Sequence, residues 1–212
     1  MNYSIAIPSY KRSDIIKDKV LKMLESYSIC KSKIFIFVEE KEIETYKQVL
    51  PEYQIIKGSK GIAGQRESIS DHFPTNEFIV SIDDDVNGIM EHSKPIINLD
   101  LFIKDTINLL LDNGLTLAGV YPVANEFFTK NTITTDLRFC VGQLKMFINK
   151  KHLEHRSYEL LEDYENTLKH YCFSGGVLRF NYITLKANYN KGKGGLKEYR
   201  TIERKLEEVE RF

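Results

Sequence analysis

The hydrophobic pattern of the amino-terminal part of the chain alternates between two periods. Compact apolar runs between polar residues are typical of buried strands, whereas apolar residues at every third or fourth position are typical of one helix face. The runs predict strands over 3–8, 33–38, 53–56 and 77–82, and helices are expected over 14–27, 41–50 and 65–72. Alternating strands and helices indicate an α/β fold: a mixed, mostly parallel central sheet flanked by helices, with its ligand crevice at the carboxyl ends of the strands.

The carboxyl-terminal part has a less regular pattern, which indicates that its strands include antiparallel members. Helices are expected over 99–113 and 156–171, and strands over 118–121 and 138–148. The charged tail 199–212 predicts a helix with one apolar stripe, typical of an element that docks or connects to further domains; the stripe is Ile202, Leu206 and Val209. The chain has no internal repeat, so we expect one domain over 1–212.

Composition places the function in a local site. Thirty basic residues balance thirty acidic ones, so no net charge attracts nucleic acid or an anionic membrane. No apolar stretch approaches the roughly 18 to 20 residues of a membrane span, and the amino terminus lacks a signal-peptide pattern. Three cysteines without pairing or zinc-ligand spacing are expected to be reduced and buried: Cys30, Cys140 and Cys172. We therefore expect a cytoplasmic protein with no nucleic-acid partner and no membrane span.

The most informative motif is a strand that ends in three carboxylates. The apolar run 77–82 stops at Asp83, Asp84 and Asp85. A strand with buried apolar side chains holds the following carboxylates at the sheet edge, and such oxygen ligands suit a divalent ion such as Mg²⁺ or Mn²⁺. A solvated acidic turn is the alternative. The preceding strand and the other motifs favour a metal site.

Three loops are expected near the same edge of the sheet. The turn 8–12 offers an aromatic ring for a base and cations for phosphate. The loop 58–66 opens a helix whose amides would face an anion together with Lys60 and Arg66, although it lacks the Gly-Lys-Ser/Thr end of an ATP-binding loop. The glycines and lysines of 191–195 suit a lid over a diphosphate. For each loop, a plain structural connection is the alternative.

A second carboxylate pair, Glu162 and Asp163, lies within the predicted helix 156–171. On a helix beside the sheet edge, such a pair could orient an acceptor hydroxyl or take its proton. A solvated helix face is the alternative. Three histidines near this pair are candidates for a further metal ligand, although lone histidines are more often structural: His152, His155 and His170.

Taken in order, these motifs resemble those of GT-A fold nucleotide-sugar glycosyltransferases. The matching segments are 5–12, 61–66, 80–85 and 161–163, and the resemblance spans about residues 3 to 175. Within this family, the chain is most similar to the amino-terminal glycosyltransferase domains of larger chlorella-virus proteins. This similarity implies a part in viral capsid glycoprotein glycosylation and favours retention of the anomeric configuration without deciding it.

The resemblance also implies roles for individual residues on the donor side. Pro8, Tyr10 and Arg12 would line the nucleoside pocket, and Arg66 would hold this pocket and the sugar. Asp83 and Asp84 would contact the ribose or the donor sugar. Further donor-binding candidates are Lys60, Gly64, Lys191 and Lys193.

The remaining acids would bind the metal and the acceptor. Asp85 would be the principal ligand of Mn²⁺ or Mg²⁺, assisted by Asp83 and by the donor diphosphate. Asp163, with Glu162 beside it, matches the acid that deprotonates the acceptor hydroxyl in inverting members of the family.

The expected activity is therefore transfer of a hexose or deoxyhexose from a UDP-sugar to a hydroxyl of a glycan or glycoprotein. Two other classes stay open. A sugar-phosphate nucleotidyltransferase uses a similar metal and nucleotide site, but no convincing triphosphate loop follows the first strand. A non-catalytic nucleotide-sugar-binding module would bind a donor without turnover.

Overall fold

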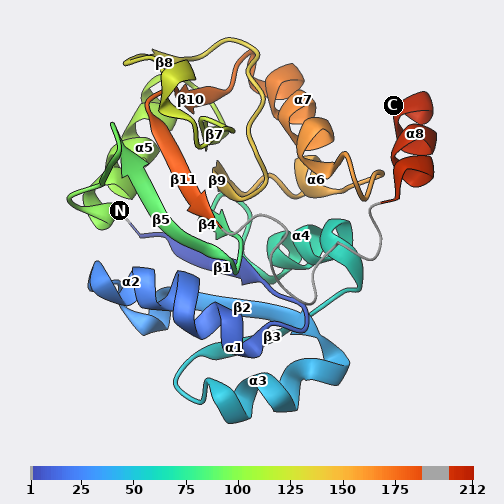
Figure 1. Ribbon diagram of the computed structural model, residues 1–212. Helices are drawn as coiled ribbons and strands as arrows, with labels where there is room; N and C mark the ends of the chain where they lie inside the picture. Colours follow the sequence, from blue (N-terminus) through green and yellow to red (C-terminus); the bar gives the residue numbers. More distant parts are fainter. Residues whose placement is uncertain (1, 188–200) are drawn as a thin grey trace.

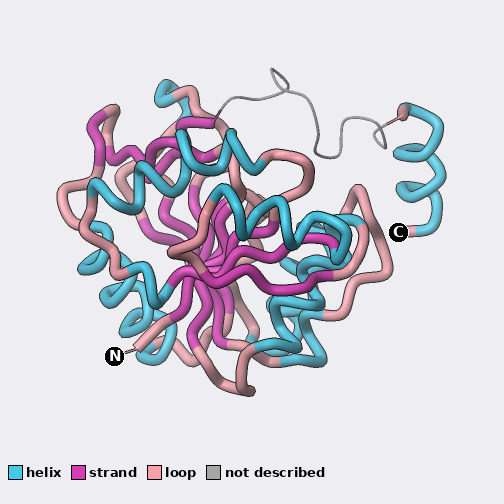
Figure 2. Tube along the Cα trace, turned by 90° about the horizontal axis from the view of Figure 1, so that it is seen from below, coloured by secondary structure: helices cyan, strands magenta, loops and turns pink. Residues whose placement is uncertain are grey.

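The computed structural model describes residues 2–187 and 201–212. A twisted eight-stranded sheet runs through the centre of the molecule with helices on both sides, and its strand order is β3-β2-β1-β4-β9-β7-β10-β8 (Figures 1 and 2). A smaller three-stranded sheet, in the order β11-β5-β6, lies beside it. This is the mixed α/β architecture that the sequence predicts, with a central sheet that is mostly parallel.

The amino-terminal half forms the parallel part of the large sheet. Its strands are β1 (Ser4–Pro8), β2 (Ile34–Glu39), β3 (Gln54–Gly58) and β4 (Phe78–Ile82), and these four strands pair with one another in parallel. One helical stretch follows β1, made of α1 (Ser13–Ile16), a π-helical turn (Lys17–Leu21) and α2 (Lys22–Ser26). Short 3₁₀ turns lie at Lys31–Lys33 and Glu40–Glu42, and the crossings are completed by α3 (Ile43–Val49) and α4 (Gly61–His72). The strands and helices predicted here are confirmed, except that α4 begins earlier, at Gly61.

The second half completes both sheets. In the large sheet, β9 (Leu144–Ile148) lies antiparallel between β4 and β7 (Leu117–Val120), and β10 (Leu178–Phe180) and β8 (Ile133–Thr134) form the edge. The small sheet consists of β5 (Val86–Glu91), β6 (Lys94–Pro95) and β11 (Ile183–Ala187). The remaining helices are α5 (Leu99–Asp112), α6 (Lys151–Glu154), α7 (Glu162–Ser174) and α8 (Ile202–Arg211), with a 3₁₀ turn at Glu126–Phe128. Antiparallel members are thus present, as predicted.

Two predicted elements are shorter than the sequence pattern indicates. The strand expected over 138–148 begins only at Leu144, because the amides of Cys140 and Gly142 bond to side chains of α7 instead of a neighbouring strand. The helix expected over 156–171 begins only at Glu162. The six amides of 156–161 donate to carboxylates from other parts of the chain, those of Glu67, Glu165 and Glu208. Long-range contacts override the local helical spacing here.

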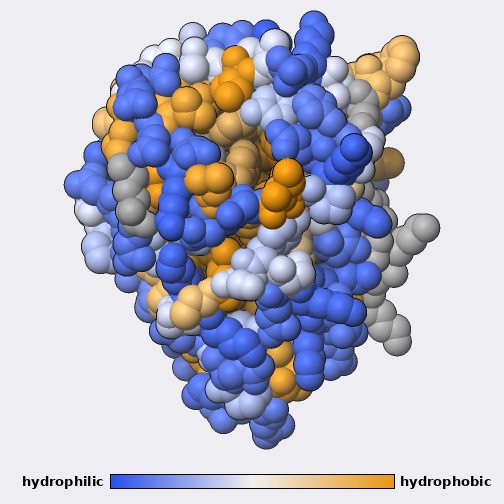
Figure 3. Space-filling model, turned by 90° about the vertical axis from the view of Figure 1, so that its left-hand side faces the viewer, coloured by the Kyte–Doolittle hydropathy of each residue, from blue (hydrophilic) through white to orange (hydrophobic). Residues whose placement is uncertain are grey.

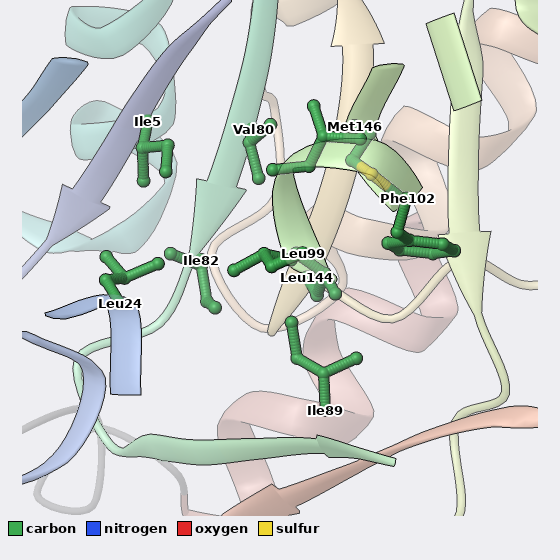
Figure 4. A pocket seen from close by; sticks show the side chains of 10 residues that line it. Ile5, Leu24, Val80, Ile82, Ile89, Leu99, Phe102, Leu144 and Met146 are labelled. Carbon is green, nitrogen blue, oxygen red and sulfur yellow. The ribbon is translucent and has the colours of Figure 1, made fainter. Parts of the chain in front are cut away.

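The core lies between the sheets and their helices, and the completely buried Ile5, Ile7 and Ile36 illustrate the continuous apolar runs of a sheet covered on both faces. The core contains a small cavity of about 10 Å³, and Figure 4 shows that the side chains around it converge from the large sheet, from the helices and from β5. Its lining is entirely apolar: Ile5, Leu24, Val80, Ile82, Ile89, Leu99, Phe102, Ile103, Leu144 and Met146. An apolar cavity of this size offers no polar partner to a ligand or a water molecule, so it is a packing defect and not a ligand site.

Hydrophilic and hydrophobic residues are interspersed on the face shown in Figure 3. Within the described ranges 2–187 and 201–212, no helix is both long and apolar enough to cross a bilayer. One cysteine prediction is wrong: Cys140 is buried, but Cys30 and Cys172 are exposed. All three are free thiols.

Candidate functional site

The three acids of the triplet face different surroundings at the turn from β4 into β5. The amide of Asp83 donates to the carbonyl of Gln143 at 2.9 Å, and the amide of Val86 donates to the carbonyl of Asp83 at 3.3 Å, so the turn is fixed by its backbone. The Asp84 side chain is only 6% exposed, whereas those of Asp83 and Asp85 are 29% and 19% exposed. The outer two carboxylates are therefore the ones accessible to a ligand.

Asp84 ties the triplet to the loop after β1. Its carboxylate accepts hydrogen bonds from Ser9 Oγ at 2.6 Å and Arg12 Nη1 at 2.8 Å. Because Ser9 gives its proton to Asp84, the Tyr46 hydroxyl donates to Ser9 Oγ at 2.8 Å and accepts from the Arg12 amide at 3.0 Å. Burial raises the pKa of Tyr46 to about 12, so this hydroxyl stays neutral and able to donate. The chain of bonds fixes the turn 8–12 against the acids.

Arg66 connects the triplet to the second half of the chain. Its guanidinium is almost fully buried and donates to Asp83 Oδ1 at 2.7 Å and to Ser81 Oγ at 2.6 Å. It also donates to the carbonyl of Gly142 at 2.8 Å and lies 3.5 Å from Glu162 Oε1. One side chain of α4 thus joins the ends of β4 and α7.

Glu162 lies in a buried group of positive charges. Lys145 Nζ is 3.1 Å from its Oε2, Arg156 Nε is 3.4 Å from the same atom, and Arg66 approaches its other oxygen. Burial acts to raise the pKa of Glu162, but these three cations outweigh burial and lower it to about 2. Glu162 is therefore ionised and anchors the start of α7.

Asp163 follows Glu162 in α7 but has fewer polar partners than Glu162. Its carboxylate accepts hydrogen bonds from the backbone amide of Gly142 at 3.4 Å and from that of the next residue, Tyr164, at 3.0 Å. Burial and the negative charge of Glu162 raise its pKa above the ordinary value. A side chain at position 142 would place a Cβ 2.8 Å from Glu162 Oε1, so glycine is needed for this close approach. A carboxyl with a raised pKa next to an anchored acid has the properties of a proton acceptor.

The start of α4 already holds an anion from the chain itself. The Glu159 carboxylate accepts from the amides of Ile62 and Ala63, where the sequence predicts a bound anion. Gly61 has a φ of +81°, and a Cβ there would lie 2.4 Å from Glu159 Oε1, so glycine is needed. Gly64 packs closely on Ser59, and Lys60 is exposed. Roles for Lys60 and Gly64 in donor binding stay predictions.

The residues predicted for the nucleoside pocket lie at the end of β1. Pro8 is buried and in register with Phe37 of β2. The Tyr10 ring is partly exposed between two lysines, with Lys11 Nζ 4.9 Å and Lys41 Nζ 5.2 Å from its centre. A partly exposed ring flanked by cations is suited to stacking and to phosphate binding.

The structure therefore brings together most of the predicted site: Arg12, Arg66, Asp83, Asp84, Asp85, Glu162 and Asp163. Lys191 and Lys193 lie outside the described residues. The histidines near the second pair have structural partners: buried His170 bonds to Glu154 and Thr116, His155 contacts Glu67, and His152 packs on Phe173.

Sequence reasoning did not identify several residues that shape the site. Ser9 was inside a recognised motif, and its position after β1 was a usable signal. For Lys145, Arg156 and Glu159 the sequence offers no such signal, because the residues that they contact lie in other elements of the fold.

The outer acids of the triplet suit a divalent cation of the hard, oxygen-binding class. Burial and the charges of Asp83 and Asp84 raise the pKa of Asp85 to about 6, although Arg12 Nη1 lies 3.6 Å from its carboxylate. Within residues 2–187 and 201–212, no three or more His, Cys, Asp or Glu side chains are arranged to hold a metal ion. The site therefore suits an ion that binds one or two carboxylates and completes its coordination with water or phosphate oxygens, as Mg²⁺ commonly does.

No protein-family model and no curated protein sequence matches the chain. Solved structures do match in fold. Staphylococcus aureus TarS 1-349 in complex with UDP-GlcNAc has a TM-score of 0.61 at 15% identity, covering 95% of this chain and 62% of TarS. Glucosyl-3-phosphoglycerate synthase from Mycobacterium tuberculosis has a TM-score of 0.58 at 11% identity, covering 93% and 74%. This chain has the GT-A-like fold and spans about three fifths of the TarS chain.

The same fold also occurs in a nucleotidyl-type enzyme. The 4-diphosphocytidyl-2C-methyl-D-erythritol synthase of Anaerococcus prevotii has a TM-score of 0.53 at 13% identity, covering 93% of this chain and 92% of that one. At these identities the similarity concerns the fold alone. The reaction must be argued from the site.

Proposed function

We propose that the protein is a metal-dependent glycosyltransferase that moves a hexose or deoxyhexose from a UDP-sugar to a hydroxyl of a glycan or glycoprotein. One observation carries the proposal. Arg66 contacts the accessible Asp83 on one side and the start of α7, which carries Asp163, on the other, so a candidate metal ligand and a candidate base are positioned by the same side chain.

The donor would bind at the triplet. Asp85, assisted by Asp83, would hold Mn²⁺ or Mg²⁺, and this ion would neutralise the diphosphate of the donor as it departs. Arg12 is fixed by Asp84 beside the same acids, so its charge is pre-positioned for a negative ligand. Pro8 and Tyr10 at the end of β1 would receive the nucleoside.

The acceptor would bind at Asp163. In an inverting reaction, Asp163 would take the proton of the attacking hydroxyl, for which a raised pKa is favourable. In a retaining reaction, it would orient that hydroxyl. The resemblance to viral domains favours retention, a glycoprotein acceptor of a viral capsid and a location in the host cytoplasm. Product analysis by NMR would assign the anomer.

A nucleotidyltransferase is the second candidate, because an enzyme of that class shares the fold over nearly its full length. It would transfer the nucleotidyl group of a nucleoside triphosphate to a sugar phosphate, forming a nucleotide sugar and releasing pyrophosphate. Pyrophosphate release without sugar transfer would replace the first proposal by this one.

The first experiment is calorimetric titration with UDP, GDP, CMP and ADP, each with Mn²⁺ and with a chelator. We expect UDP binding that requires Mn²⁺ and is lost in Asp85→Asn. The matched control is Asp112→Asn, at an exposed acid on the end of α5, which should bind as wild type. Retained metal-dependent binding and turnover in Asp85→Asn would contradict the proposal.

A further inference from the structure

A stacked aromatic pair lies next to Asp163, with one ring exposed (Tyr164) and the other half-buried (Phe139). Phe139, on the loop before β9, stacks on Tyr164 in the first turn of α7, with ring centres 4.2 Å apart and an angle of 22° between the planes. Tyr164 is 47% exposed, and two exposed leucines, Leu137 and Leu168, lie two residues before Phe139 and one helical turn after Tyr164. Residues four apart share one face of a helix. Exposed apolar patches of this kind commonly mark binding sites.

The backbone connects this pair directly to the candidate base. The amide of Tyr164 donates to Asp163 Oδ1 at 3.0 Å, and the amide of Gly142, three residues after Phe139, donates to Asp163 Oδ2 at 3.4 Å. The loop itself is fastened to α7, since the Cys140 amide donates to Thr167 Oγ1 at 3.2 Å. The ring pair and the Asp163 carboxylate are therefore held as one unit.

The same loop also contacts the residues proposed to bind the donor. The carbonyl of Gly142 accepts from Arg66, which also holds Asp83. An acceptor hydroxyl at Asp163 would thus have the donor residues on one side and the α7 surface with Tyr164 on the other. The body of the acceptor has to occupy a surface that adjoins Asp163, and the ring pair provides one.

We propose that Phe139 and Tyr164 form a platform on which a pyranose ring of the acceptor stacks. The proposal rests on the proposed function and narrows its acceptor to a carbohydrate. The C–H face of a pyranose is apolar and suits a flat aromatic surface, while its hydroxyls need polar partners. Asp163 supplies one such partner, and the exposed ion pair of Asp136 and Arg138 lies within three residues of Phe139. Stacked rings are ordered before binding, so little conformational entropy is lost.

The platform can be tested by direct binding of simple sugars. The probes are the methyl α- and β-pyranosides of glucose, galactose, mannose and N-acetylglucosamine, observed by saturation-transfer NMR at millimolar concentration. We expect at least one glycoside to bind wild type with the saturation on its ring protons. Tyr164→Ala should weaken that binding roughly tenfold, as loss of an aromatic contact does, and Tyr164→Phe should restore it.

The matched control is Phe173→Ala, which removes an equally exposed aromatic ring, 51% exposed, from the other end of α7. It should bind glycosides as wild type. Phe139→Leu, which removes the stack from the loop side, repeats the test if Tyr164→Ala does not fold. The inference is overturned if wild type binds none of these sugars, or if Tyr164→Ala and Phe139→Leu bind them as well as Phe173→Ala.

The UDP titration separates this inference from the proposed function. Manganese-dependent UDP binding should be the same in Tyr164→Ala and wild type, because the platform lies on the acceptor side. Glycoside binding that depends on Tyr164 without any UDP binding would keep the carbohydrate platform and reject the transferase. UDP-sugar turnover with an acceptor KM unaffected by Tyr164→Ala would keep the transferase and reject the platform.

Discussion

The two groups of acids in this protein differ in how their charge is balanced. At the end of β4, the three carboxylates of the triplet are contacted by two arginines, Arg12 and Arg66. Behind them, two buried carboxylates, those of Glu154 and Glu162, are contacted by Lys145, Arg156, His170 and again Arg66. The first group is short of positive charge and partly accessible, whereas the second is buried and compensated.

This difference separates acids that build the fold from acids that are available to a ligand. A buried carboxylate surrounded by cations gains nothing from a further ion, and removing one of its partners leaves an uncompensated charge. A partly exposed carboxylate beside two others gains from any cation that arrives. Asp163 borders both groups, since it follows the anchored Glu162 and has a raised pKa.

The largest effect is expected for Asp163→Asn. If Asp163 acts as the base, the substitution should lower the rate of sugar transfer by roughly 10² to 10⁴-fold, the usual range for a general base. Stability should not fall, because burial disfavours the ionised carboxyl that the amide replaces. Transfer assays and urea denaturation measure the two effects. Asp112→Asn, at an exposed acid on the end of α5, is the control. A large loss of stability in Asp163→Asn would place Asp163 with the structural acids.

The compensated group is tested by Lys145→Met. Lys145 is almost completely buried against Glu162, so its removal should cost about 3 to 5 kcal/mol in the free energy of unfolding. Lys104→Met is the matched control, because Lys104 pairs with Asp100 at 2.6 Å, one helical turn away on α5, and the two side chains are 42% and 36% exposed. Exposed pairs of this spacing contribute about 0.3 to 0.5 kcal/mol. Equal denaturation midpoints for the two variants would show that the buried group is not a structural anchor.

The two groups also differ in how much of them the sequence predicts. The triplet follows a strand, so its place at the sheet edge can be derived from the periodicity alone, and the structure places Asp83 to Asp85 there. Lys145 sits in a strand with an otherwise apolar pattern, and nothing near it in sequence indicates that Glu162 is its partner. Pairing between β9 and the start of α7 requires the three-dimensional fold.

The same reason explains the misplaced start of α7. The apolar spacing over 156–171 is real, but the carboxylates that take up the amides of 156–161 come from Glu67, Glu165 and Glu208. Two of these lie more than forty residues away along the chain. Local periodicity contains no information on such contacts, so the spacing predicts a helix that starts too early, whereas α7 begins at Glu162.

The pH dependence of stability should have opposite signs for the two groups. The folded pKa of Glu162 is lowered to about 2, so its stabilisation is complete above the unfolded value near 4.5 and is lost as pH falls toward 2. The folded pKa of Asp85 is raised to about 6, so folding favours its protonated form, and stability falls as pH rises from about 4 to about 6.

Comparison of wild type with Asp85→Asn isolates the second trend. The variant should gain stability over wild type between pH 4 and pH 6, reaching roughly 1 to 2 kcal/mol after allowance for solvent screening. Urea denaturation at half-unit steps of pH measures the gain. Saturating Mn²⁺ should reduce it, since an ion bound to the native carboxylates stabilises wild type. A gain that is independent of pH would mean that the triplet is not short of positive charge.

The smallest effect is expected at Glu208 of α8, which shows a third way to balance a carboxylate. It accepts the amides of Glu159, Leu160 and Leu161 at 3.1, 2.8 and 3.1 Å, so backbone dipoles take the place of cations. α8 lies at the edge of the molecule (Figure 1), and its carboxyl-terminal part contacts the rest of the protein, with the Tyr158 hydroxyl donating to the carbonyl of Arg211 at 2.6 Å. Glu208→Gln keeps the shape and removes the charge.

We expect Glu208→Gln to change the free energy of unfolding by less than about 1 kcal/mol, because a solvent-accessible hydrogen bond contributes little net stability. Hydrogen exchange at the three amides should nevertheless become severalfold faster, since local opening does not require global unfolding. Glu207→Gln, at the exposed neighbouring position, is the control. Faster exchange should extend to the amides of Ile62 and Ala63, which the Glu159 carboxylate covers. Unchanged exchange there would show that Glu159 holds the start of α4 independently of α8.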